Sequence, residues 1–126
     1  MTMILTRDHK ESLIESLVDD PEFARVLLAE AASTFLNGEA DTARLMLQVL
    51  VDATVGFDAI AETSSISNEK LRETLSNHGA PDMDLVAMIF TAIRNHLRVT
   101  MHVTSVDAGS QQAGFESMTQ TRPDAA

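Results

Sequence analysis

The chain contains no cysteine among its 126 residues, so disulfide bonds and thiolate metal sites are excluded. It also has no stretch approaching the roughly 20 consecutive apolar residues that a membrane-spanning helix requires. The N-terminal sequence MTMILTRDHK has too short an apolar run for a signal peptide, and charged residues follow at once. We therefore expect a cytoplasmic protein with no membrane partner.

Basic side chains are scarce. Nine Lys and Arg stand against 19 Asp and Glu, which gives a formal net charge of −10. Such a charge disfavours broad attraction to nucleic acid or anionic membranes. Residues 1–53 hold 4 basic and 10 acidic residues, a net charge of −6, whereas residues 54–104 hold 4 and 6, a net charge of −2. The middle part of the chain is therefore the least repelled by DNA.

Patterns typical of catalysis or cofactor binding are missing as well. The chain has no P-loop and no G-x-G-x-x-G motif, and its four histidines lack a metal-binding spacing within one helix. The acidic pairs Asp58/Glu62 and Glu69/Glu73 fall one helical turn apart on faces predicted to be exposed, whereas a catalytic pair needs a pocket with two unequal environments. We expect no enzyme activity, no catalytic residue, no metal and no cofactor.

Apolar periodicity predicts an all-α fold of about six helices. The first three are expected at residues 7–18, 21–36 and 39–53, and the third should be central because few charges interrupt its run LMLQVLV. Asp20-Pro21-Glu22 is typical of a helix start and Asn37-Gly38 of a helix end. In the second helix the residues expected to face the core are Phe23, Leu27, Ala31 and Phe35, with Val26 and Leu28 beside them. The last helix is expected at residues 82–97, beginning at Asp82 or Asp84.

Residues 98–104 alternate between apolar and polar side chains, which predicts a short C-terminal strand. A lone strand has unpaired backbone groups on both edges. Pairing with the same strand of a second copy would satisfy one of them, so we expect a homodimer. Residues 1–104 are then a single helical domain, and residues 105–126 form a flexible tail.

Residues 56–79 have the pattern of a helix-turn-helix, with a short helix at 57–63, a tight turn at 64–66 and a second helix at 67–77. Ile60 and Ala61 supply an apolar and a small residue, and Ile66 follows the turn. Leu71 and Leu75 would hold the second helix against the first. The candidate DNA-binding residues lie at the start and on the outer face of that second helix: Ser67, Asn68, Glu69, Lys70, Arg72, Glu73 and Ser76.

From about Leu5 to Val103 the chain resembles a family of short bacterial helix-turn-helix regulators that includes HigA-like, Xre-type antitoxins of toxin–antitoxin modules. The resemblance is carried by the segments LTRDHKESL, DPEFARVLLAEA, FLNGEADTARLMLQVLVDATVGFDAIAETSSIS and LRETLSNHGAPDMDLVAMI, in this order. It implies an all-helical fold, dimerisation and binding to a double-stranded DNA operator. For some members it also implies binding to a ribonuclease toxin.

The sequence departs from the family pattern in the helix-turn-helix itself. Ser65 stands where a turn glycine is usual, and Gly79-Ala80-Pro81 replaces Gly-Asn-Pro. Glu69 and Glu73 lie on the surface that would face DNA phosphates. A carboxylate is repelled there unless it accepts a hydrogen bond from a cytosine amino group.

Two interpretations follow. The leading one is a dimeric transcriptional regulator of antitoxin type that represses its own operon. Either the acidic residues 1–53 or the flexible tail would cover a basic ribonuclease toxin, and the charge of −6 favours residues 1–53. In this interpretation Asn68 either reads adenine or only supports the helix start, and Arg72 and Lys70 contact bases or phosphates. The alternative is a protein-interaction module that keeps the helix-turn-helix without specific DNA binding. Arg72 and Lys70 would then pair with Glu69 or Glu73 as solvated helix charges.

Overall fold

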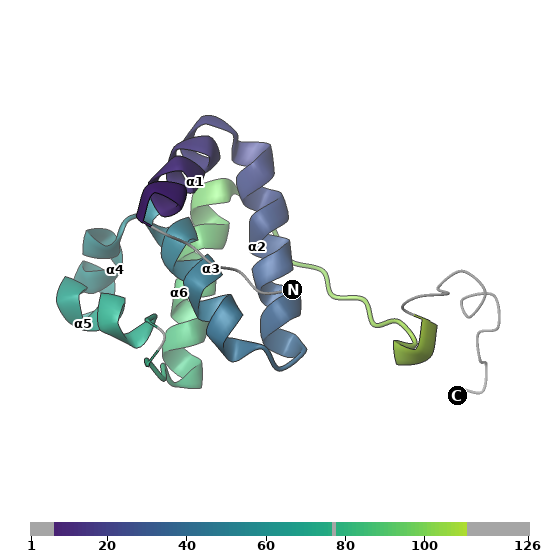
Figure 1. Ribbon diagram of the computed structural model, residues 1–126. Helices are drawn as coiled ribbons and strands as arrows, with labels where there is room; N and C mark the ends of the chain where they lie inside the picture. Colours follow the sequence, from purple (N-terminus) through teal and green to yellow (C-terminus); the bar gives the residue numbers. More distant parts are fainter. Residues whose placement is uncertain (1–6, 77, 111–126) are drawn as a thin grey trace.

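The computed structural model describes residues 7–76 and 78–110, and most of this part of the chain is α-helical (Figure 1). The helices are α1 (Arg7–Asp19), α2 (Pro21–Leu36), α3 (Ala40–Ala53), α4 (Phe57–Ser64), α5 (Asn68–Thr74) and α6 (Met83–Leu97). A short 3₁₀ turn follows at Ala108–Ser110. The predicted all-α fold of about six helices is confirmed for these residues. Over the same residues, none of the helices has the length and apolar character needed to cross a lipid bilayer.

Helix α3 forms the centre of the body, because α1, α2 and α6 all pack against it. Figure 1 shows α2 on one side of α3 and the α4–α5 pair on the other. The buried side chains of α3 are Ala43, Met46, Leu47, Val49, Leu50 and Val51. The central position predicted from the apolar run in this helix is therefore confirmed.

Helix α2 begins as the sequence predicted but faces the core differently. The side chain of Asp20 caps the helix, since its Oδ1 accepts hydrogen bonds from the backbone N–H groups of Glu22 and Phe23 at 3.1 and 3.2 Å. The fully buried residues of α2 are Ala24, Leu28 and Ala31.

The predicted apolar face of α2 was therefore partly wrong. Phe35 is 36% exposed and Val26 is 58% exposed, whereas Phe23 and Leu27 are half-buried. Apolar residues lie on more than one side of this helix, and the buried side includes two small alanines that allow α3 to approach closely. Phe35 lies at the C-terminal end of the helix, and the centroid of its partly exposed ring is 6.4 Å from that of Phe90 on α6.

The two ends of α6 are fixed by polar contacts. Of the two predicted starting residues, Asp82 is the cap, because its Oδ1 accepts a hydrogen bond of 2.8 Å from the backbone N–H of Leu85. At the other end Arg98 adopts the left-handed conformation with φ of 57°. The guanidinium of Arg25 donates two hydrogen bonds, of 3.2 and 3.0 Å, to the carbonyl oxygen of Leu97. Arg25 therefore joins α2 to the last turn of α6.

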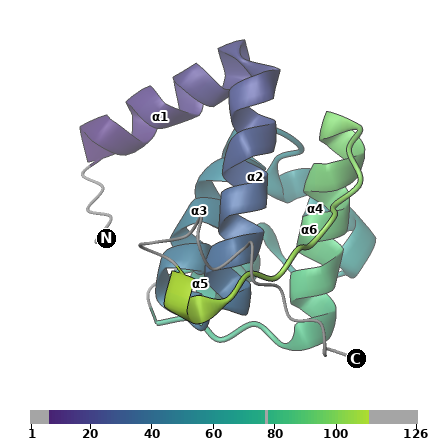
Figure 2. The ribbon, with the colours of Figure 1, turned by 90° about the vertical axis from the view of Figure 1, so that its right-hand side faces the viewer.

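Residues 99–107, here called the C-terminal arm, leave the end of α6 in an extended course past α2 (Figures 1 and 2). Val99 and Met101 are half-buried against the core, whereas Val103 and Val106 are 66% and 65% exposed. The strand predicted at residues 98–104 is not formed in this single chain, since the described residues offer the arm no neighbouring strand with which to pair. Pairing with a second copy stays a prediction. Of the predicted tail, residues 111–126 lie outside the described residues.

Candidate functional site

The turn between α4 and α5 is tight and contains a residue in the left-handed conformation. Ser65 adopts a left-handed conformation, with φ of 65° and ψ of 22°, and its N–H donates a 2.9 Å hydrogen bond to the carbonyl of Ala61. The Oγ of Ser64 accepts a hydrogen bond of 3.1 Å from the N–H of Ile66. A glycine would adopt this backbone conformation without steric cost. Ser65 therefore takes the conformational role of the turn glycine that the sequence lacks.

Buried apolar side chains hold α5 against the body. Leu71 and Leu75 are 0% exposed, and Phe57 and Ile60 of α4 are 2% exposed. Ala61 and Ile66 are half-buried against the same core. The predicted inward positions of the second helix are confirmed, together with the spacing that places them there.

Helix α5 is shorter than the predicted segment 67–77, because it ends at Thr74. The hydroxyl of Thr74 donates to the carbonyl of Lys70 at 2.7 Å, and that of Ser76 donates to the carbonyl of Glu73 at 2.6 Å. Side-chain bonds of this kind compete with continued helix. Asn77, the predicted last residue, lies outside the described residues.

The chain after α5 turns sharply at Gly79. A Cβ atom added at this glycine would lie 1.9 Å from the carbonyl oxygen of Thr74. No side chain fits at that distance without movement of the backbone. The glycine therefore fixes how closely the following loop passes the end of α5.

The side chain of Ser67 caps the start of α5. The Oγ of Ser67 accepts a hydrogen bond of 3.1 Å from the N–H of Lys70. Glu69 lies in the first turn, where a negative charge interacts favourably with the helix dipole. The local sequence therefore supports this short helix in addition to its buried leucines.

Asn68 and Arg72 do not point freely into solvent but belong to a polar network that joins three helices. The Nδ2 of Asn68 donates to Oδ1 of Asp58 on α4 at 2.6 Å, and the Oδ1 of Asn68 accepts from Nε of Arg72 at 3.0 Å. The guanidinium of Arg72 then reaches Asp52 on α3, with Nη2–Oδ1 and Nη1–Oδ2 distances of 3.0 and 3.5 Å. We call this set of four side chains the Arg72 network.

The Arg72 network also packs against the aromatic ring of Phe57. The guanidinium carbon of Arg72 lies 4.4 Å from the centroid of the Phe57 ring, which is a cation–π distance. The sequence-based alternative paired Arg72 with Glu69 or Glu73, and this pairing was wrong. The ion-pair partner is Asp52, twenty residues earlier in the chain.

The remaining outer face of α5 is exposed at the edge of the molecule (Figure 1). Four of the seven predicted site residues line one shallow hollow there: Ser67, Glu69, Lys70 and Glu73. Two carboxylates and one ammonium group give this face a net charge of −1. Ser76 is half-buried at the helix end, where its Oγ also accepts a 3.3 Å hydrogen bond from the N–H of His78. The structure thus divides the predicted site into an exposed acidic face, the internally bonded Asn68 and Arg72, and a helix-end serine.

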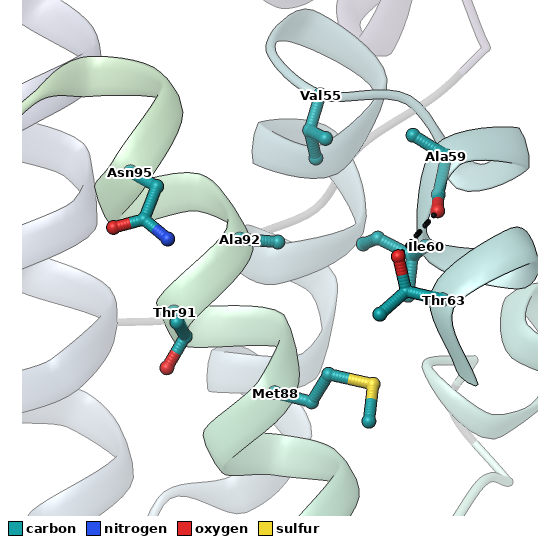
Figure 3. A pocket seen from close by; sticks show the side chains of 8 residues that line it. All are labelled: Val55, Ala59, Ile60, Thr63, Met88, Thr91, Ala92 and Asn95. Atoms are coloured by element: carbon teal, nitrogen blue, oxygen red, sulfur yellow. Dashed lines mark hydrogen bonds between the residues drawn. The ribbon is translucent and has the colours of Figure 1, made fainter.

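A second hollow, which sequence reasoning missed, lies between α4 and α6 (Figure 3). It has a volume of about 230 Å³. The residues that line it are Val55, Ala59, Ile60, Thr63, Met88, Thr91, Ala92 and Asn95. Figure 3 shows Ile60 and Ala92 pointing toward one another across it, and the Oγ1 of Thr63 donates a hydrogen bond of 3.2 Å to the carbonyl of Ala59. Its walls come from chain segments far apart in sequence, so no local pattern could indicate it.

A tight left-handed turn, a buried clamp and an exposed second helix together form a helix-turn-helix arrangement at residues 57–74. No protein-family model, curated protein or solved structure matches the chain.

Proposed function

We propose that this protein is a DNA-binding transcriptional regulator in which α5 is the recognition helix. The observation that carries the proposal is the packing of α5. The buried side chains of Leu71 and Leu75 fix its inner face against the body of the protein, while its outer face is exposed to solvent. A recognition helix needs this combination, because its position must be fixed while its N-terminal residues reach base edges in the major groove. Loose helices of the same length would not keep such a position.

The side chains of α5 divide into those that favour DNA and those that restrict where it binds. The ammonium group of Lys70 and the hydroxyl of Ser67 can donate hydrogen bonds to phosphate oxygens. The carboxylates of Glu69 and Glu73 only accept hydrogen bonds, so they suit a cytosine amino group and repel phosphates. The proposal therefore places α5 with Lys70 toward the backbone and the two glutamates toward the groove floor.

Two copies of the protein would bind two half-sites. In this proposal the C-terminal arms pair along residues 98–104, and the two recognition helices enter successive major grooves about one helical turn apart. The extended course of the arm and its exposed valines support such pairing. The operator would accordingly be a double-stranded pseudo-palindrome.

The antitoxin role is a further part of the proposal and concerns the other end of the molecule. Residues 1–53 carry a net charge of −6. On α1 the carboxylates of Asp8, Glu11, Glu15 and Asp19 are all exposed. An acidic surface of this kind complements a basic ribonuclease-type toxin in the cytoplasm. Co-expression with the product of the adjacent gene tests this part, and the absence of a stable complex would remove it.

DNA binding is tested by fluorescence anisotropy with a duplex from upstream of the gene, over a series of salt concentrations. We expect nanomolar-range affinity that falls steeply as salt rises, with weaker binding to a random duplex. Lys70→Gln should weaken binding to both duplexes, whereas the matched control Lys10→Gln on α1, whose ammonium donates to Gln48, should not. Equal affinities for the two variants would contradict the placement of α5 on DNA.

A protein-interaction module is the second candidate, and one observation favours it. The exposed face of α5 has two carboxylates and one ammonium group, while the positive charge of Arg72 is already matched by Asp52. A face with this charge fits a basic protein surface better than a polyanion. The two candidates separate in the same titration, since the interaction module binds no duplex even at low salt.

A further inference from the structure

The guanidinium of Arg72 is bound on three sides within its own chain. Asp52 approaches both terminal nitrogens, Asn68 accepts from Nε, and the Phe57 ring covers one face. The side chain of Asp52 is only 19% exposed, whereas that of Arg72 is 47% exposed. The arginine is therefore reachable from solvent while its charge is held by a carboxylate that lies deeper in the protein.

A carboxylate and a phosphate present the same feature to an arginine, namely two oxygens that accept from the planar fork of nitrogens. Asp52 meets both terminal nitrogens of Arg72, which is how a DNA phosphate would also meet them. The two terminal nitrogens cannot donate in this way to a carboxylate and to a phosphate at the same time. Asp52 and DNA therefore compete for one group.

Asp58 maintains this arrangement from the other side. Its Oδ1 accepts from the amide nitrogen of Asn68, so the amide oxygen of Asn68 is turned toward Arg72. With this orientation fixed, neither the amide of Asn68 nor the guanidinium of Arg72 is free to approach a base. The two side chains are therefore held or released together.

We infer that Asp52 is an internal competitor of DNA, which holds Arg72 on Phe57 in the free protein and must be displaced before Arg72 contacts a duplex. The inference rests on the proposed function. It adds that the affinity of the helix-turn-helix is limited by a residue on α3 that does not itself face the groove. The apparent affinity of such a protein falls by the fraction of molecules in which the competent state is populated.

The test compares Asp52→Asn with Glu22→Gln, since each removes one carboxylate charge and one ion pair. Glu22 lies on α2, where it pairs with Arg25 and is 76% exposed. We expect Asp52→Asn to bind the upstream duplex about threefold to tenfold more tightly than Glu22→Gln does. Its salt dependence should also steepen by about 0.9 in log–log slope, because one more phosphate contact is gained.

The double variant Asp52→Asn/Arg72→Ala distinguishes release of the arginine from simple loss of a negative charge. If Asp52 acts through Arg72, removing the Asp52 carboxylate raises the affinity only when Arg72 is present, so the double variant binds no more tightly than Arg72→Ala alone. A gain that persists without Arg72 overturns the inference, as does a gain no larger than that of Glu22→Gln. Thermal unfolding of each variant checks the fold, and Asp52→Ala replaces Asp52→Asn if the amide disturbs the packing.

A probe that needs no DNA completes the test. Phenylglyoxal modifies accessible guanidinium groups, and its rate at Arg72 can be followed by peptide mass spectrometry. The rate should rise several-fold in Asp52→Asn and stay unchanged in Glu22→Gln. If the wild-type protein binds DNA and Asp52→Asn shows no gain, this inference fails and the proposed function stands. If no variant binds any duplex, both fail, whatever the rate at Arg72.

Discussion

Replacing Leu71 by alanine should release α5 from the body of the protein. Leu71 is 0% exposed and belongs to the same buried cluster as Leu75, Phe57 and Ile60. Leucine-to-alanine changes at such positions cost about 2–5 kcal/mol of unfolding free energy. Because α5 has only 7 residues, it is too short to be stable without this packing. We expect a loss of about 3 kcal/mol, which corresponds to a fall in Tm of roughly 15 °C.

Urea and thermal unfolding followed by circular dichroism measure this loss. The matched control is Glu69→Ala on the same helix, because Glu69 is exposed and its removal should change the unfolding free energy by no more than about 0.5 kcal/mol. If Leu71→Ala and Glu69→Ala shift the transition by the same small amount, α5 is not packed as described. The packing of α5 on which the proposed function rests would then be refuted as well.

Three further changes test the ends and the turn of the helix-turn-helix by the same unfolding measurements. Ser67→Ala removes the cap on the N–H of Lys70 and should cost about 1 kcal/mol; an unchanged transition would show that the cap contributes nothing. Gly79→Ala places a Cβ against the carbonyl of Thr74 and should cost about 1–3 kcal/mol; a variant as stable as wild type would contradict the close passage of the loop. At Ser65, whose φ is 65°, glycine should be tolerated, whereas valine should cost more than about 1 kcal/mol; equal stability of the two variants would argue against the left-handed turn.

Local chemistry explains why the helix positions could be predicted. Asp20 before Pro21 starts α2, and Asn37 before Gly38 ends it, through contacts within a few residues of each helix end. The inward positions of α5 followed from spacing alone, since Leu71 and Leu75 are four residues apart and both are buried. Neither prediction needed information from distant parts of the chain.

The rotation of α2 could not be predicted in this way. Its sequence has apolar residues on several sides, so periodicity does not select between the side with Phe23 and Val26 and the side with Ala24 and Leu28. Contact with α3 makes the selection, because small residues allow the closer approach. The packing of α2 against α3 therefore determines which side of α2 is buried, and the sequence of α2 alone does not.

The placement of Asn68 and Arg72 on the outer side of the second helix was predicted, but their contacts with other helices were not. Asn68 and Arg72 were identified because both lie on the outer side of the second helix, and their mutual hydrogen bond spans only four residues. Asp52 lies twenty residues before Arg72 on another helix. Its role depends on how α3 and α5 pack, which no pattern within either helix contains. The same reason applies to the hollow between α4 and α6.

The C-terminal arm is also where the protein should become sensitive to proteases. Extended and exposed backbone is the most readily cleaved part of a folded protein. Val99 and Met101 are half-buried against the core, whereas every described residue from 102 to 109 is exposed. Cleavage within the arm should therefore separate the helical body from whatever follows it, while the recognition helix and the Arg72 network stay intact. Pairing of two arms would hide this region, so resistance to cleavage would rise with protein concentration.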